Sequence, residues 1–120
     1  MKTSITKILT FDAAHSLPEH RGKCAGVHGH GYRLEVTVGG VVHHAGPATG
    51  MVMDFGDLDD TIERLVVGPL DHTYLNDVLT VVPTAEGIAG WAFATLRDAG
   101  LPVQRVRLWE TPTSYADVTE

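Results

Sequence analysis

An alternating segment at residues 28–39 constrains the fold of this chain more than any other feature. Every second residue from position 32 is apolar: Tyr32, Leu34, Val36 and Val38. Because side chains alternate between the two faces of a strand, this period of two predicts a β-strand with one buried face. His28 and His30 share the apolar parity, so their imidazoles project to the same side, about 6–7 Å apart at the backbone.

Residues 3–14 predict a second strand by the same alternation. One parity is apolar, with Lys7 as the exception: Ile5, Leu9, Phe11 and Ala13. His15 continues that parity, so we expect it at the end of an apolar face and not in solvent. If the two strands pair as neighbours, His15, His28 and His30 lie on matching faces.

Two helices are expected in the middle of the chain. Apolar residues recur at helical spacing over residues 55–67, and Gly68 with Pro69 is expected to end that helix. Residues 84–99 predict the second helix, with Thr84 as its N-cap.

The C-terminal part predicts two more strands, at residues 103–110 and 114–118, and residues 51–53 suggest a short extended run. The resulting order ββααββ predicts an α+β fold, in which a four-stranded antiparallel sheet carries two helices on one face. Such a sheet has two open edges, so we expect the chain to form a homo-oligomer through them.

Length and charge narrow the classes of function. The 120 residues suit a single domain spanning 1–120, and the net charge of −6 argues against a protein that coats nucleic acid or an anionic membrane. No long apolar run or secretory signal is evident, so a cytoplasmic location is expected. A short basic stretch at residues 20–23 is either a solvated loop or a local patch for a small anionic substrate.

Three histidines on matching strand faces predict a zinc site, because neutral imidazoles suit Zn²⁺ and three protein ligands leave one position open for catalysis. Cys24, the only cysteine, has two interpretations. It is either a fourth ligand that closes a structural Cys-His₃ site, or a free thiol whose pKa is lowered by the ion and by Lys23. The sequence spacing does not decide between them.

A second group of polar residues suggests acid–base chemistry and ligand recognition. Asp71 precedes His72, and a carboxylate beside an imidazole can orient it for proton transfer. Thr84, Glu86 and Glu110 are candidates for recognising a polar heterocycle, because a carboxylate accepts two parallel N–H bonds.

These motifs, taken together and in order, resemble the 6-pyruvoyl-tetrahydropterin synthase / 6-carboxy-tetrahydropterin synthase family. They occupy residues 11–15, 24–30, 54–55, 70–77, 83–86 and 109–111. The resemblance implies the tunnelling fold, whose trimers close into a barrel and pair into hexamers with active sites at subunit interfaces. It also implies the site residues: zinc on His15, His28 and His30, catalysis by Cys24, Asp71 and His72, and pterin binding by Glu110, Thr84 and Glu86.

Within that family the chain is more similar to the bacterial carboxy-forming branch, because only three residues separate Cys24 from His28. The reaction implied converts 7,8-dihydroneopterin triphosphate to 6-carboxy-5,6,7,8-tetrahydropterin, acetaldehyde and triphosphate, on the route to queuosine and other 7-deazapurines. Two alternatives remain: formation of 6-pyruvoyl-tetrahydropterin without carbon–carbon cleavage, and a non-catalytic zinc-binding structural module.

Overall fold

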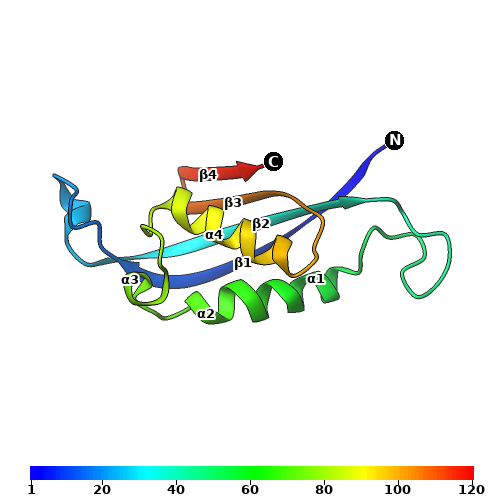
Figure 1. The fold of residues 1–120 in the computed structure, drawn as a ribbon, viewed down its shortest axis with the longest axis horizontal. Helices are drawn as coiled ribbons and strands as arrows, with labels where there is room; N and C mark the ends of the chain where they lie inside the picture. The colour runs from blue at the N-terminus through cyan, green and yellow to red at the C-terminus, as the bar shows by residue number, and fades with distance from the viewer.

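One antiparallel sheet organises the computed structural model, which describes residues 1–120 (Figure 1). Its strands lie in the order β1-β2-β3-β4. Their bounds are Thr3–His15 for β1, His28–Gly40 for β2, Val103–Thr111 for β3 and Ser114–Thr119 for β4. The expected α+β architecture, with an antiparallel sheet and helices on one face, is confirmed.

The register of β1 and β2 places the predicted apolar parities on one face. Phe11 lies opposite Tyr32, and His15 lies opposite His28 at the end of the ribbon. Tyr32 and Phe11 are buried, and their rings stack with centroids 5.0 Å apart. The core therefore extends along this face up to the histidines.

Helix α4 (Ala85–Asp98) covers β3 and β4 on this face. The Thr84 hydroxyl accepts a hydrogen bond from the Gly87 backbone N–H at 3.0 Å, which confirms the predicted N-cap. The buried side chains of α4 include Ile88 and Leu96.

The helix that begins at Phe55 runs one turn further than predicted. Helix α1 (Phe55–Ile62) continues through a π-helical turn, η2 (Glu63–Val67), into the short α2 (Gly68–Leu70). The π turn shifts the hydrogen-bond register, so that the Gly68 N–H bonds to the Glu63 carbonyl. A Cβ at position 68 would lie 2.9 Å from that oxygen. Gly68 was expected to end the helix, but it instead permits the π turn through which the helix continues.

Shorter elements differ from the sequence-based expectation in two places. Residues 51–53 form no strand, because their loop bonds to itself: the His43 N–H donates to the Met51 carbonyl, and the Gly50 N–H donates to the His43 carbonyl. The two connections near the histidines contain one-turn helices, η1 (Lys23–Ala25) and α3 (Leu75–Val78). None of the helices combines the length and apolar character needed to span a lipid bilayer.

The other face of the sheet is polar and carries its own ion pairs. Glu35 is nearly buried there, accepts a hydrogen bond from the Trp109 indole at 2.6 Å, and lies 3.7 Å from Arg105. Arg107 forms two hydrogen bonds to Asp117, at 2.7 and 2.8 Å. Arg105 and Arg107 are therefore paired with carboxylates of the same chain.

Candidate active site

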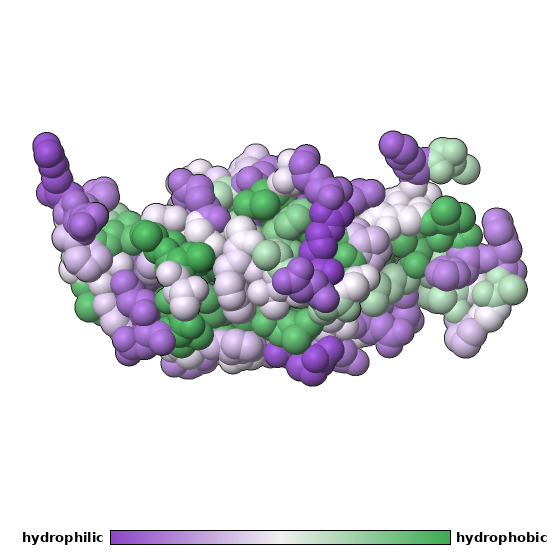
Figure 2. Space-filling view, viewed as in Figure 1, coloured by the Kyte–Doolittle hydropathy of each residue, from purple (hydrophilic) through white to green (hydrophobic).

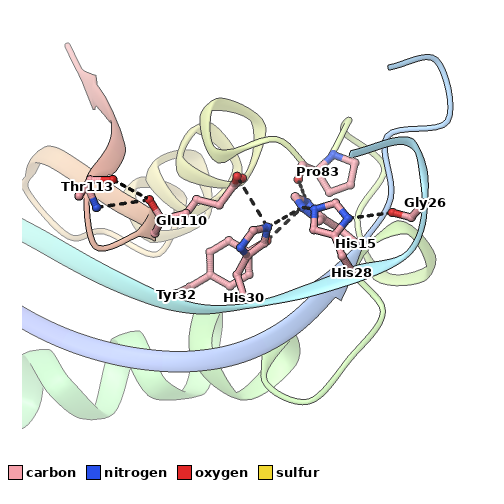
Figure 3. A network of polar contacts seen from close by, with 9 residues as sticks. His15, Gly26, His28, His30, Tyr32, Pro83, Glu110 and Thr113 are labelled. Carbon is pink, nitrogen blue, oxygen red and sulfur yellow. Dashed lines mark hydrogen bonds and ion pairs between the residues drawn. The ribbon is translucent and has the colours of Figure 1, made fainter. Parts of the chain in front are cut away.

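Three imidazoles meet where β1 ends and β2 begins (Figure 3). The Nε2 atom of His15 lies 2.9 Å from that of His28 and 3.2 Å from that of His30. The ligand atoms of all three lie within 4.8 Å of one another. His15 is buried, whereas His28 and His30 are partly exposed, so the cluster has one open side.

Backbone carbonyls determine which ring nitrogens face the centre of the cluster. His15 Nδ1 lies 2.6 Å from the Pro83 carbonyl, and His28 Nδ1 lies 2.8 Å from the Gly26 carbonyl. A carbonyl oxygen only accepts, so each Nδ1 carries the proton and each Nε2 presents a lone pair.

Two lone pairs facing each other at 2.9 Å repel unless a cation lies between them. Tetrahedral zinc with Zn–N bonds of about 2.0–2.1 Å separates its nitrogen ligands by about 3.3 Å, which is close to the separations in this cluster. The donor set and its tautomers therefore fit a divalent metal ion.

The surroundings of His30 keep that imidazole neutral. Burial lowers the pKa of His30 below its usual 6.5, and His15 and His28 lower it further, while Glu110 acts in the opposite direction. Glu110 Oε1 lies 3.7 Å from His30 Nε2. The buried Tyr32 hydroxyl closes the inner side of the cluster, and burial, then Glu110, raises its pKa. A neutral imidazole is the form that binds metal.

Asp71 and His72 form a second, separate cluster along the outer edge of β1. Asp71 Oδ1 accepts hydrogen bonds from the Asp12 N–H at 3.0 Å and from His72 Nδ1 at 2.9 Å. The first of these bonds, followed by that from His72, lowers the pKa of the Asp71 carboxyl. Adjacent residues in a loop often point in different directions, but the side chains of Asp71 and His72 contact each other.

The backbone at His72 is strained, with a φ of 58° that is uncommon for a residue other than glycine. The His72 N–H donates to the Asp12 carbonyl at 2.6 Å, and the Ala14 N–H donates to the Thr73 carbonyl at 3.0 Å. These bonds to the edge strand hold the loop in place and leave the His72 ring exposed. Such strain concentrates at functional sites.

Cys24 lies in neither cluster. It sits half-buried in η1, where its carbonyl accepts a hydrogen bond from the Leu17 N–H at 2.8 Å. Its thiol is not among the ligand atoms grouped around the three histidines. Within this chain, the closed Cys-His₃ arrangement is therefore not formed.

Of the three residues predicted to recognise a ligand, two line a cavity and the third does not. Glu110, which lies 3.7 Å from His30, lines a cavity of about 420 Å³ together with Glu86, Tyr115 and Asp117. Thr84 is not among the residues that line it, and its hydroxyl is used as the cap of α4.

Sequence reasoning missed the groups that orient these side chains. The Pro83 and Gly26 carbonyls fix the histidine tautomers, and the Asp12 backbone holds Asp71. Backbone groups carry no residue-type signal, so only the fold reveals them. Asp12 itself was detectable as the outward residue between the inward Phe11 and Ala13.

Comparison with known proteins agrees with this architecture. A solved structure of the Caenorhabditis elegans 6-pyruvoyl tetrahydropterin synthase superposes with a TM-score of 0.87 at 27% identity, covering 100% of this chain and 96% of that one. A 6-carboxy-5,6,7,8-tetrahydropterin synthase of Synechocystis is 48% identical, covering 93% of this chain and 89% of the relative. The protein of that name in Haemophilus influenzae is 36% identical, covering 97% of this chain and 98% of the relative.

The 6-pyruvoyl tetrahydropterin synthase family matches residues 4–120, and the chain belongs to this family.

Proposed function

We propose that the chain is a zinc-dependent lyase that converts 7,8-dihydroneopterin triphosphate to 6-carboxy-5,6,7,8-tetrahydropterin, acetaldehyde and triphosphate. The observation that carries the proposal is the cluster of three imidazoles, in which the Nε2 lone pairs of His15 and His28 face each other. It occurs in a chain that is 48% identical to a protein named for that product. The similarity favours the carboxy-forming reaction over others in the family.

His15, His28 and His30 would hold the zinc ion. When bound there, zinc supplies a Lewis acid for oxygen atoms of the substrate side chain. Burial of His15 and its hydrogen bond to the Pro83 carbonyl hold that ring in one orientation. A fixed ring favours the metal ion whose coordination geometry it matches.

Cys24, Asp71 and His72 would move the protons. The Asp71 carboxylate, kept ionised by the Asp12 N–H, holds Nδ1–H of His72, so that Nε2 of the exposed ring is free to accept or donate a proton. The Cys24 thiolate would take or relay the second proton.

The position of Asp71 and His72 along a free edge of the sheet supports an oligomeric site. Asp71 and His72 lie along the edge of β1, while the metal cluster opens at the strand ends. We propose a hexamer built from two trimers, in which these two residues act on the Cys24 of a neighbouring subunit. The residues 1–120, which share one hydrophobic core, would form one domain of that assembly.

Glu110 would anchor the pterin, since its carboxylate faces both the cavity and the histidines. A carboxylate accepts two parallel N–H bonds from a guanidine-like ring edge. Glu86 would line the same cavity, and Thr84 would contribute by fixing the start of α4.

Formation of 6-pyruvoyl-tetrahydropterin is the second candidate, favoured by the name of the C. elegans structure. Both routes release triphosphate, but only the carboxy route adds water across the bond between the two side-chain carbonyls and releases acetaldehyde. A non-catalytic zinc module ranks below both, because Cys24 lies outside the histidine cluster.

The test is product analysis by mass spectrometry after incubation of the zinc-loaded protein with 7,8-dihydroneopterin triphosphate. We expect 6-carboxytetrahydropterin and acetaldehyde in equal amounts. A pyruvoyl product without acetaldehyde would assign the second candidate, and no turnover in a zinc-containing protein would support the structural module. Cys24→Ala should retain zinc and lose most turnover, whereas loss of zinc from this variant would contradict a catalytic role.

A further inference from the structure

We propose that Arg21 and Lys23, in the loop between β1 and β2, bind the triphosphate group of the substrate. This inference rests on the proposed function, which supplies the substrate. A multiply charged anion must approach a chain of net charge −6, so cations at the site have to compensate. The zinc ion proposed at the three histidines would face the oxygen atoms of the substrate side chain, and neither that cluster nor the Asp71–His72 pair contains a Lys or Arg for the triphosphate.

Most cations of the chain are already matched. The sequence contains nine Lys and Arg residues, and five of them form ion pairs: Lys7, Arg33, Arg97, Arg105 and Arg107. Lys2, Arg21, Lys23 and Arg64 form none. Only these four have no carboxylate partner in the chain.

Position selects two of the four. Lys2 precedes β1 at the end opposite His15, and Arg64 lies in the π turn η2. Arg21 and Lys23 lie between His15 and His28, in the connection that joins two of the three imidazoles. Both side chains are exposed, and Lys23 directly precedes Cys24.

Hydrogen bonds fold this loop back on itself at the site. The Leu17 N–H donates to the Cys24 carbonyl at 2.8 Å, and the His20 N–H donates to the Leu17 carbonyl at 2.8 Å. The Gly22 N–H donates to His20 Nδ1 at 2.9 Å. The loop projects at one end of the molecule, where hydrophilic side chains gather (Figures 1 and 2). It holds two cations against one carboxylate, that of Glu19.

The order of groups along the site matches the order of groups along the substrate. Glu110 lies on one side of His30, and Gly26, near the end of the loop, lies beyond His28 on the other side (Figure 3). The substrate carries its pterin ring at one end, a three-carbon side chain in the middle and the triphosphate at the other end. With the ring at Glu110 and the side chain at the histidines, the triphosphate extends toward the loop.

The open face of the sheet is the competing location and fits less well. Arg33, Arg105 and Arg107 project from the face opposite the histidines. Arg33 and Arg105 share the buried Glu35, and Arg107 pairs with Asp117, so an anion there would compete with Glu35 for its arginines.

Inorganic tripolyphosphate is the probe that tests the loop directly. Its affinity for the zinc-loaded full chain is measured by calorimetry for wild type, R21A, K23A and R21A/K23A. Arg64→Ala is the matched control, because it removes an exposed, unpaired cation that lies away from the site. We expect the double variant to bind tripolyphosphate roughly 10–100-fold more weakly, and R64A to bind as wild type does.

Steady-state kinetics with 7,8-dihydroneopterin triphosphate give the second readout. KM should rise by a similar factor in R21A/K23A, while binding of phosphate-free 7,8-dihydroneopterin stays unchanged. Raising the salt concentration should increase KM less in the double variant than in wild type.

The two proposals fail in different ways. Wild type that turns over no dihydroneopterin triphosphate contradicts the proposed function, yet a loss of tripolyphosphate binding in the double variant still supports an anion site in the loop. Unchanged tripolyphosphate affinity in R21A/K23A, or an equal loss in R64A, overturns the loop assignment.

Discussion

The three-histidine cluster and the Asp71–His72 pair use the same side chain in opposite settings. The three imidazoles stand on paired strands, and two of them are fixed by hydrogen bonds to carbonyls. His72 lies on a loop, at a strained φ of 58°, with its side chain 78% exposed. Only its neighbour Asp71 orients its ring.

This contrast suggests two different tasks. Strand pairing fixes positions, which a metal site needs because ligand distances vary little. An exposed ring held by one carboxylate keeps a free nitrogen and can exchange protons with substrate or solvent. The three imidazoles are thus suited to hold an ion, and His72 is suited to carry a proton.

Replacing one strand histidine should have the largest effect. His28→Ala removes a ligand without opening the core, because His28 is partly exposed. We expect this variant to lose its bound zinc, measured by metal analysis, and to show no measurable turnover in a product assay. His44→Ala removes an exposed histidine far along the chain and should change neither. Full zinc content in H28A would contradict the assignment.

Replacing the loop histidine should separate turnover from metal binding. His72→Ala is expected to retain one zinc per chain and to lose roughly 10²–10⁴-fold in kcat, the usual contribution of a general acid or base. Metal analysis measures the zinc content of H72A, and the product assay measures its kcat. A loss of zinc in H72A would place this residue in the metal site and break the contrast.

Glu110 lies against the strand cluster and should affect substrate binding more than the metal. Glu110→Gln keeps the shape but loses the charge that pairs with the ring edge, so KM should rise about 10–100-fold. Glu63→Gln, at an exposed carboxylate of η2, is the control. A KM equal to that of wild type would remove Glu110 from the pterin site.

The smallest effect concerns pH and Asp71. Its pKa is lowered in the folded chain, so its ionised form stabilises the fold above the ordinary carboxyl pKa, and this contribution is lost as the pH falls through the lowered value. Asp71→Asn should therefore slightly lower Tm at pH 7, and the difference from wild type should close in acid. Asp77→Asn, in the same connection, controls for charge. A difference in Tm that does not depend on pH would argue against this role for the carboxylate.

The sequence predicted the parts of the site that lie on strands. Because side chains alternate strictly, the parities of Phe11 and Tyr32 determined on which face His15, His28 and His30 would stand. Strand pairing then brought these rings together. The N-cap at Thr84 was also predictable, because capping depends only on residues that are close in the sequence.

The rest depended on contacts that sequence patterns do not encode. Asp71 meets Asp12 across 59 positions through a backbone N–H, which any residue could supply. The π turn at Glu63 arises from a register shift that Gly68 tolerates, whereas glycine followed by proline usually indicates a helix end. The roles of Cys24, Asp71 and His72 stay predictions, because they depend on how subunits meet.

X-ray absorption at the zinc edge of the loaded protein tests the central claim most directly. The account predicts three imidazole nitrogens at about 2.0–2.1 Å, a light atom in the remaining position and no sulfur. The same spectrum is expected for Cys24→Ala. A sulfur neighbour at about 2.3 Å in wild type that disappears in this variant would show a closed Cys-His₃ site and contradict the account.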